Sequence, residues 1–290
     1  MKETHIPVLL PEVLEVLQPK TGESYLDLTA GYAGHASKIL AVTQNYKDSV
    51  LVDRDPNAVE YLRGKFAEFP IEIWQKDFYS STLQLLKCGK TFDMVLVDLG
   101  VSSPQLDNSE RGFSFMQDGP LDMRMDTTQS LTAEKIVNTW SADRLVKILT
   151  ECGDESLGLA RKHARMICEQ RPFHTTGELA AAFGPRHGRK HPATQAFQAI
   201  RIAVNGEIDL LNGLLVLLPE ILNPGGRVAI ITFHSIEDRA VKRYFKEQST
   251  LGKESPFRLI TKKPLVAGDV ELGSNPRSRS AKLRAAQKLF

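Results

Sequence analysis

Cysteine, long apolar runs and net charge are all scarce in this chain, and each scarcity removes a class of protein. The three cysteines, Cys88, Cys152 and Cys168, are odd in number and far apart in a chain of 290 residues, so neither a disulfide framework nor a cysteine metal site is expected. No apolar run approaches the roughly 20 residues of a membrane-spanning helix, and the first residues lack the basic and apolar regions of a signal peptide. These absences predict a cytoplasmic protein with no membrane partner.

The formal net charge of +2 does not by itself announce nucleic acid, but the positive charge is unevenly distributed. One basic run spans 186–191. After Glu271 there is no acid, and five cations follow: Arg277, Arg279, Lys282, Arg284 and Lys288. Clustered positive charge is what phosphate binding needs, although a solvated surface and a basic tail would explain the pattern equally well.

The most informative stretch is Tyr25–His35, which predicts a buried strand ending at Asp27, a turn of small residues, and a helix that starts near His35. The glycines of the turn allow close approach of a ligand, and a helix start offers free N–H groups. The turn is not a full G-x-G-x-x-G, and Asp27 would repel a pyrophosphate. A carboxylate there favours a ligand with positive charge, such as S-adenosylmethionine, which carries a sulfonium and an ammonium group. An ordinary strand-to-helix turn is the bland alternative.

A second acid supports a nucleotide-type cofactor. Asp53 ends the apolar strand Val50–Asp53, about one strand-helix-strand unit downstream. A carboxylate at that strand end is well placed to accept hydrogen bonds from both hydroxyls of a ribose. The adenosine of a nicotinamide dinucleotide would satisfy it equally, so Asp53 does not separate the two cofactors.

Strands and helices alternate through the first part of the chain, which predicts an α/β fold with a doubly wound parallel sheet. After a first helix at 7–19, strands are expected near 24–29, 49–53, 71–74 and 92–98, with helices at 34–43 and from 56 onward. Between about 107 and 191 no strand is convincing. Helical spacing instead appears at 133–140, 142–152, 156–170 and 176–183. We therefore expect an inserted all-helical domain at 109–200, between methyltransferase-like halves at 1–108 and 201–290.

The second half is expected to complete the same sheet. A long helix from about Thr194 to Leu218 leads to a turn at 223–226 and a central strand at 227–233. Strands near 257–261 and in the C-terminal region could close the sheet in antiparallel fashion.

The loop after the fourth strand, Asp98–Asp107, is the candidate for catalysis. Ligands bind at the carboxyl ends of strands in such sheets, and a methyl acceptor amine needs hydrogen-bond acceptors that orient it and stabilise its growing charge. Asp98, the loop carbonyls and Gln105 could serve. Alternatively Asp98 caps backbone amides and Ser-Ser-Pro is a turn of common composition.

Histidines give weaker signals. His234 directly follows the strand at 227–233, so a functional role and a structural one are equally supported, while Glu237 and Asp238 could cap the next helix. His187 and His191 are four residues apart but flank a glycine and precede a proline. They are read as loop residues, and no metal site is expected.

Two further stretches, Arg111–Phe115 and Leu121–Asp126, mix aromatics, arginines and acids. Phe113 or Phe115 could stack on a base, as aromatic side chains do in readers of single-stranded RNA. The alternative is a domain junction held by Phe and Met packing and Arg–Asp pairs, which suits the methionines better.

Together these segments resemble the bacterial small-subunit ribosomal RNA cytosine-N4 methyltransferases of the RsmH or MraW type. The resemblance covers almost the whole chain, from His5–Leu10 to Asn275–Ser280. It includes Asp98–Asp107, Arg111–Met116, Gly119–Asp126, His191–Thr194, Phe197–Ile202 and Phe233–Asp238.

The resemblance implies a Rossmann-like class I methyltransferase sheet with a helical insert, and S-adenosylmethionine as cofactor. Its cofactor contacts map to Ala33, Gly34, His35, Asp53, Phe78, Asp98 and Gln105. Ala33 stands where the family usually has glycine, so a methyl group is expected to fit only at negative φ, and cofactor affinity is in question. The insert reads Gly153-Asp154-Glu155 where the family usually has Gly-Glu-Glu.

The resulting hypothesis is methylation of the exocyclic N4 of a cytidine in 16S ribosomal RNA, in the decoding region of the small subunit. Asp98 is the candidate catalytic residue and His234 a weaker one. The insert and the basic tail would hold RNA phosphates. Three alternatives stay open: a methyltransferase acting on DNA or protein, a nicotinamide oxidoreductase, which Asp27 disfavours, and a binding-only ribosome-assembly factor. Whether the chain is a monomer or a weak homodimer also stays open.

Overall fold

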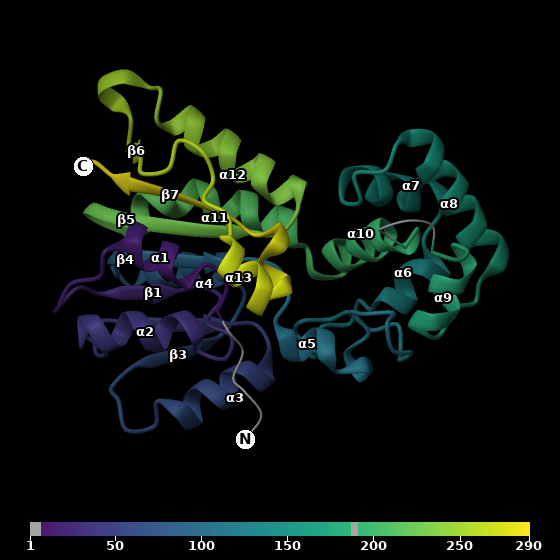
Figure 1. The fold of residues 1–290 in the computed structure, drawn as a ribbon, viewed down its shortest axis with the longest axis horizontal. Coiled ribbons are helices and arrows are strands. Elements are labelled where there is room, and N and C mark those ends of the chain that lie inside the picture. Colours follow the sequence, from purple (N-terminus) through teal and green to yellow (C-terminus); the bar gives the residue numbers. More distant parts are fainter. Residues whose placement is uncertain (1–6, 187–190) are drawn as a thin grey trace. The chain divides into compact units, whose positions relative to one another are not determined.

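The computed structural model describes residues 7–186 and 191–290, which form two compact units. One unit combines Met1–Gly100 with Asp209–Phe290, and the other is Val101–Ile208 (Figure 1). The expected limits of the insert, residues 109 and 200, both lie inside the second unit. The chain therefore leaves the first unit two residues after its fourth strand, within the loop Asp98–Asp107, and returns within a helix.

The first unit is built on a seven-stranded sheet with the order β3-β2-β1-β4-β5-β7-β6. Its strands are β1 (Tyr25–Asp27), β2 (Val50–Asp53), β3 (Glu72–Gln75), β4 (Phe92–Asp98), β5 (Leu222–Thr232), β6 (Phe257–Leu259) and β7 (Lys282–Lys288). The first five run parallel, and β7 lies antiparallel between β5 and β6. The order 3-2-1-4-5 is that of a doubly wound sheet, so the expected α/β class and the antiparallel closure are both confirmed.

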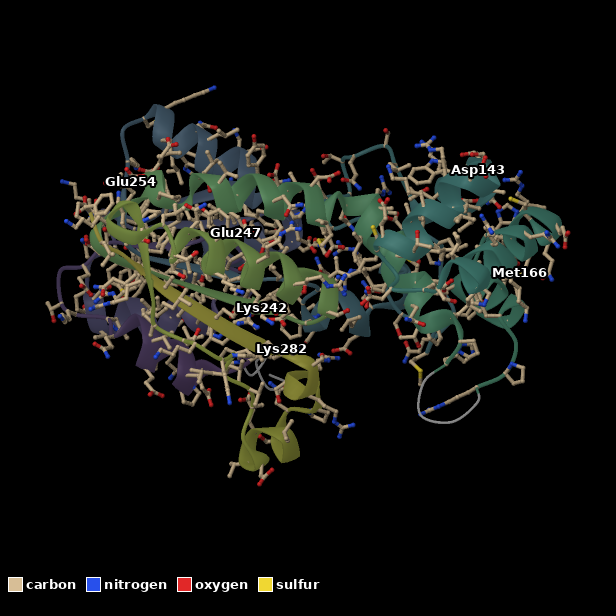
Figure 2. All side chains as sticks on the ribbon, turned by 90° about the horizontal axis from the view of Figure 1, so that it is seen from above. Asp143, Met166, Lys242, Glu247, Glu254 and Lys282 are labelled. Carbon is tan, nitrogen blue, oxygen red and sulfur yellow. The ribbon has the colours of Figure 1, made fainter. Side chains whose placement is uncertain are left out.

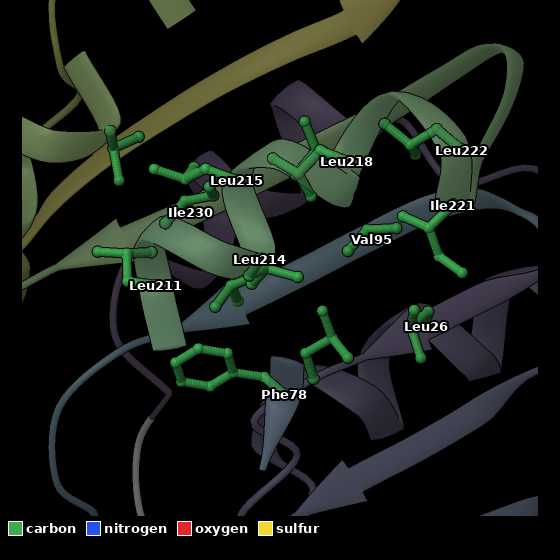
Figure 3. Close-up of a cluster of buried hydrophobic side chains, with 14 of the residues drawn as sticks. Leu26, Phe78, Val95, Leu211, Leu214, Leu215, Leu218, Ile221, Leu222 and Ile230 are labelled. Carbon is green, nitrogen blue, oxygen red and sulfur yellow. The ribbon is translucent and has the colours of Figure 1, made fainter. Parts of the chain in front are cut away.

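Helices cover both faces of this sheet, because its central strands are apolar on both sides. On one face α1 (Leu10–Leu17), α2 (Gly34–Thr43) and α3 (Pro56–Lys65) bury Val13, Ile39 and Leu62. On the other face α4 (Phe78–Lys87), α11 (Glu207–Ile221) and α12 (Ser235–Gln248) pack over β4 and β5. Figure 3 shows the row Leu211, Leu214, Leu215 and Leu218 of α11 in this second cluster, with Phe78 from α4 beside it.

The remaining segments of the first unit are short. They are the 3-10 helices at Gly252–Glu254 and Pro276–Ser280 and the helix α13 (Asp269–Ser274). The basic tail expected from the sequence is largely strand β7. Its Arg284 is buried and donates to the carboxylate of Asp238 at 2.7 Å, and Lys288 donates to the carbonyl of Leu222 at 2.8 Å. These two cations are therefore paired within the protein.

Two sequence predictions for the second half were wrong in detail. The long helix from Thr194 to Leu218 is two helices, α10 (Ala193–Asn205) and α11, because Gly206 adopts φ 61° and ends the first in the left-handed conformation. The turn at 223–226 is a bulge inside β5. The pairing with β4 jumps from Phe92 opposite Leu222 to Met94 opposite Arg227, and Gly225 supplies a φ of 78°.

The second unit is helical, as predicted. It contains α5 (Ser103–Asp107), a 3-10 turn at Ser109–Arg111, α6 (Ala133–Thr139), α7 (Ala142–Glu151), α8 (Leu157–Gln170), α9 (Thr176–Ala182) and α10. Side chains capping α6 to α9 are Thr132, Ser141, Ser156 and Thr175, each accepting a backbone N–H of the first turn. The four helices predicted from apolar spacing are confirmed to within two residues at each end.

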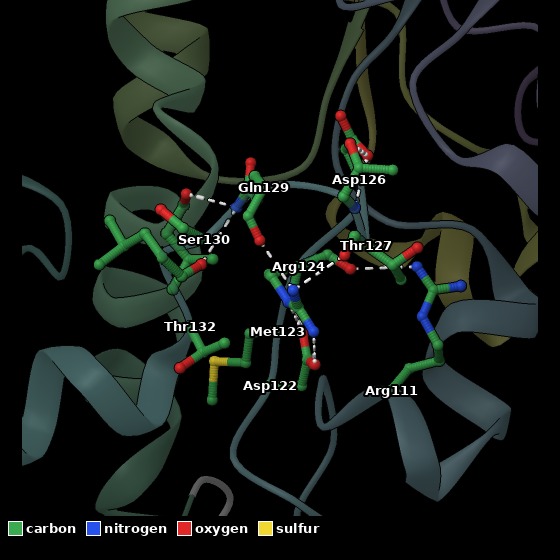
Figure 4. A network of polar contacts seen from close by, with 12 residues as sticks. Arg111, Asp122, Met123, Arg124, Asp126, Thr127, Gln129, Ser130 and Thr132 are labelled. Atoms are coloured by element: carbon green, nitrogen blue, oxygen red, sulfur yellow. Dashed lines mark hydrogen bonds and ion pairs between the residues drawn. The ribbon is translucent and has the colours of Figure 1, made fainter.

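The stretch Leu121–Asp126 is part of the scaffold of this unit (Figure 4). Arg124 forms a two-pronged ion pair with Asp122, with N–O distances of 2.8 and 2.6 Å. Arg111 donates to the carbonyls of Arg124 and Met125, each at 3.0 Å. Met123 and Met125 are buried in the helical core. The expected methionine packing and Arg–Asp pair are therefore confirmed, but these contacts lie within the second unit and stabilise that unit alone.

Phe113 is buried in the same core, with the Arg111 guanidinium 5.8 Å from its ring centre, so it has no open face on which to stack a base. Phe115 is half-buried between Phe197 and His191, with ring centres 4.7 and 5.0 Å away. The base-stacking interpretation fails for Phe113 because its apolar ring is buried in the helical core, where it stabilises the fold.

No single helix in the described ranges is long and apolar enough to cross a membrane; α10 and α11 reach that length and composition only as a bent pair.

Candidate functional site

Three aspartates end three adjacent strands at one edge of the sheet. Asp27 ends β1, Asp53 ends β2 and Asp98 ends β4, and the sheet order places β1 between the other two. Because these strands are parallel, their carboxyl ends meet at the same edge, where ligands bind in open α/β sheets. The edge predicted from the sequence is therefore assembled in the structure.

Asp27 is almost fully buried and has a partner for each oxygen. The hydroxyl of Tyr25 donates to Oδ2 at 2.7 Å, and the N–H of Thr29 donates to Oδ1 at 3.2 Å. Burial raises the pKa of Asp27 to about 7, against these two hydrogen bonds, and the charge of Asp53 raises it further. Asp27 is thus held in place by Tyr25 and Thr29.

Asp53 fixes the glycine turn after β1. Its Oδ2 accepts the N–H of Gly31 at 2.8 Å, and its Oδ1 accepts the N–H of Asp55 at 2.8 Å. Gly31 has a φ of 51°, which glycine adopts without strain. Burial raises the pKa of Asp53 to about 6. Each carboxylate oxygen can accept a second hydrogen bond, so two ribose hydroxyls still find acceptors here.

Asp98 is the least satisfied acid of the edge. Its backbone N–H donates to the hydroxyl of Thr29 at 2.6 Å, while its Oδ1 is buried without a hydrogen-bond donor from the described residues. Its Oδ2 lies 3.8 Å from Nδ1 of His35. Burial raises the pKa of Asp98 well above its usual value, and the charges of Asp27 and Glu237 add to the effect. A buried acceptor in this state favours an incoming donor.

The segment after β5 carries a fourth carboxylate. Oε2 of Glu237 accepts the N–H of Phe233 at 2.8 Å, and Oε1 lies 3.1 Å from Nε2 of His234. Nδ1 of His234 accepts the N–H of Glu237 at 3.4 Å, so the two residues close a capping box at the start of α12. His234 therefore helps to position the helix start through Nδ1. Its catalytic role stays a prediction.

Three of the residues expected to contact the cofactor, Ala33, Gly34 and His35, lie at the start of α2. Ala33 is the N-cap with φ 62°, and Gly34 begins the helix close to Pro7. Nε2 of His35 lies 2.9 Å from the carbonyl of Val8. The condition that a methyl group fits only at negative φ does not hold, because the methyl of Ala33 is buried in the apolar cluster beneath α2. It therefore points away from the ligand side of the turn.

Phe78 and Gln105, the other two expected contacts, have structural partners. Phe78 opens α4, with its ring in the core and the side chain of Asp77 capping the helix. Gln105 belongs to the second unit, where its Oε1 accepts the N–H of Ser102 at 2.9 Å in a capping box. Their cofactor contacts stay predictions.

Sequence reasoning missed the residues that hold the acids in place. Tyr25 stands two positions before Asp27, on the same face of β1, and strand periodicity alone could have paired them. The capping role expected for Glu237, by contrast, is confirmed, because Glu237 closes a capping box with His234. The hydroxyl of Thr29 accepts the backbone N–H of Asp98 in β4, and no local sequence pattern indicates that contact.

Within residues 7–186 and 191–290, no group of three or more His, Cys, Asp or Glu side chains has the arrangement of a metal site. His191 packs against Phe115, and His187 lies outside the described residues.

The site as a whole is a poorly solvated, anionic strand edge beside a glycine turn and a helix start.

A sequence profile described as the MraW methylase family matches residues 2–289. The chain belongs to this family. It is 45% identical over 298 residues to "Ribosomal RNA small subunit methyltransferase H" of Synechocystis sp., covering 98% of this chain and 93% of that protein.

A second relative agrees with this membership. The protein of the same name from Synechococcus elongatus is 44% identical, with 99% of this chain and 95% of that protein covered. A solved S-adenosylmethionine-dependent O-methyltransferase from Thermotoga maritima aligns over 100% of this chain and 69% of its own, with 9% identity and a TM-score of 0.44.

The raised pKa of Asp27 predicts a pH dependence of stability. The folded state holds a proton on Asp27 up to about pH 7, whereas an unfolded aspartate releases it near pH 4. The free energy of unfolding should therefore fall as pH rises from about 4 to about 7, relative to Asp27→Asn, by on the order of a few kcal/mol. Urea unfolding of both proteins at several pH values measures this. Parallel profiles would contradict the assignment.

Ala33→Gly should change little. Relief of the left-handed strain, about 1–2 kcal/mol, is offset by the lost methyl burial, about 0.8 kcal/mol, and by the freer unfolded chain, about 0.4–1 kcal/mol. Because the methyl points into the core, S-adenosylmethionine affinity should stay within about threefold of wild type. Thermal unfolding and calorimetric titration test both expectations. Gly34→Ala, whose methyl would lie 3.0 Å from Pro7, is the comparison expected to weaken binding.

Proposed function

We propose that this protein transfers a methyl group from S-adenosylmethionine to the exocyclic N4 of a cytidine in 16S ribosomal RNA, in the decoding region of the small subunit. Membership of the MraW methylase family and relatives named for small-subunit ribosomal RNA support the reaction and the substrate class. The observation that carries the assignment to this edge is the buried Oδ1 of Asp98, which has no hydrogen-bond donor among the described residues. It is an acceptor without a donor, at the place where an acceptor amine would be oriented.

The residues present fit the cofactor. The four acids of this edge, Asp27, Asp53, Asp98 and Glu237, would repel a pyrophosphate and attract a sulfonium and an ammonium group. Asp53 would hold the ribose, and the turn from Gly31 to His35 would receive the amino-acid end. When bound, S-adenosylmethionine supplies an electrophilic methyl group on a positively charged sulfur.

The protein's own contribution is positioning. The sulfonium is already a good leaving group, so orientation of the amine should matter more than a strong base. Asp98 accepts a hydrogen bond from the amine, which fixes its direction and stabilises the positive charge that develops as the methyl is gained. The raised pKa of Asp98 also suits it to hold the proton that the methylated amine releases. The cytosine would be splayed from its stack to reach this edge.

The insert supplies a surface for RNA phosphates. Its helix α8 exposes Arg161, Lys162 and Arg165 beside a hollow that Met166 and Glu169 also line. Backbone contacts of this kind position RNA without reading its sequence.

The decisive assay is transfer of labelled methyl from S-adenosylmethionine to small ribosomal subunits that lack the modification, followed by nucleoside analysis. We expect N4-methylated cytidine. Label on DNA or protein in competition would indicate the alternative acceptors. Cofactor binding without any transfer would indicate a binding-only assembly factor and would refute the proposed reaction.

Asp98→Ala should abolish transfer, with a loss of about a thousandfold or more, because one preorganised group at the reacting centre is removed. Asp98→Asn should be equally inactive yet more stable than wild type, since it replaces a buried acid whose ionisation desolvation opposes. Single-turnover transfer and urea unfolding measure the two effects. Asp48→Ala, an exposed aspartate before β2, is the matched control. Full activity of Asp98→Ala would exclude the assigned role.

A further inference from the structure

The outer face of α12 carries a basic stripe made of Lys242, Arg243 and Lys246. The three side chains are exposed, and Lys246 lies four positions after Lys242 and three after Arg243, so it neighbours both on the outer side of the helix. The opposite face, with Ala240, Val241 and Phe245, is buried on the sheet. Figure 2 shows Lys242 and Glu247 on α12, and Lys282 on the neighbouring strand β7.

The stripe is not neutralised within the protein. No ion pair to Lys242, Arg243 or Lys246 occurs in the part of the chain that the structure describes. Asp238, the acid one turn before the stripe, is already paired with Arg284 at 2.7 Å and with Lys282 at 3.4 Å. Like charges at these spacings disfavour the helix, so an external anion is the natural partner.

The position of α12 connects the stripe to the site. The helix begins with the capping box of His234 and Glu237, at the same sheet edge as Asp98. Lys242 is seven residues beyond Ser235, about 10 Å along the axis at 1.5 Å per residue. An RNA strand whose target nucleotide is bound at this sheet edge can therefore continue along the outer face of α12.

We propose that Lys242, Arg243 and Lys246 bind backbone phosphates of the ribosomal RNA that flanks the target nucleotide. This inference rests on the proposed function. A lipid surface is disfavoured, because none of the exposed large apolar side chains of the described residues lies on α12. An acidic protein is the remaining competitor, and the test below separates it from RNA.

The test neutralises the stripe with Lys242→Gln, Arg243→Gln and Lys246→Gln in one protein. Glutamine keeps helix propensity and removes the charge. The matched control is Lys20→Gln, Lys47→Gln and Lys87→Gln, three exposed lysines in segments that precede β1, β2 and β4 at the opposite edge of the sheet. Both variants lose three positive charges.

For the stripe variant we expect an apparent KM for unmodified small subunits about tenfold higher at moderate salt, with kcat and S-adenosylmethionine affinity unchanged. In direct binding to naked RNA of the target region, the slope of log affinity against log salt should become shallower by about 2, at roughly 0.7 per phosphate contact. The control should match wild type in both assays.

Equal KM and equal salt slopes for stripe variant and control would overturn the inference. A raised KM on subunits with unchanged binding to naked RNA would also overturn it, in favour of contact with an acidic ribosomal protein. Failure of wild type to methylate any subunit would instead count against the proposed function, because the binding arm of the stripe test needs no turnover.

Discussion

Mutual repulsion among carboxyl groups at one strand edge is the constraint on which the rest of the site depends. Parallel pairing brings Asp27, Asp53 and Asp98 to a common edge, and the start of α12 adds Glu237. Desolvation raises the pKa of each of the three aspartates, so ionising these carboxyl groups costs free energy in the folded state. The surrounding structure must supply enough hydrogen bonds to keep these groups in place.

Those hydrogen bonds come mostly from short-range backbone groups. Asp53 receives the N–H of Gly31 and Asp55, and Glu237 receives that of Phe233. Asp98 is the exception, since its Oδ1 has no donor among the described residues. Folded proteins seldom keep a buried polar atom without a hydrogen bond, whereas binding sites for a cationic or hydrogen-bond-donating ligand do. The least satisfied acid is thus the most informative one.

The sequence was most predictive where one local rule decides the structure. Apolar runs located the first five strands, and helical apolar spacing located the four helices at 133–140, 142–152, 156–170 and 176–183. It failed at Gly206, because apolar spacing continues across the break and only the left-handed φ reveals it. It could not show that Phe113 is buried, or that the methyl of Ala33 faces the core, since both depend on packing between distant segments. The acids at the strand ends were expected, but the partners of Asp27 and Asp98, which are Tyr25 and Thr29, were not.

The place where the chain leaves the sheet has a consequence for its synthesis. β4 pairs with β5, yet the whole helical unit lies between them in sequence. During translation the edge of β4 therefore stays unpaired until the insert and α11 have emerged. Loop closure costs only about 0.6 kcal/mol more for each doubling of loop length, so the excursion is thermodynamically mild. An insert that folds early also fixes the positions of its two ends. This shortens the time for which the unpaired apolar edge of β4 is open to aggregation.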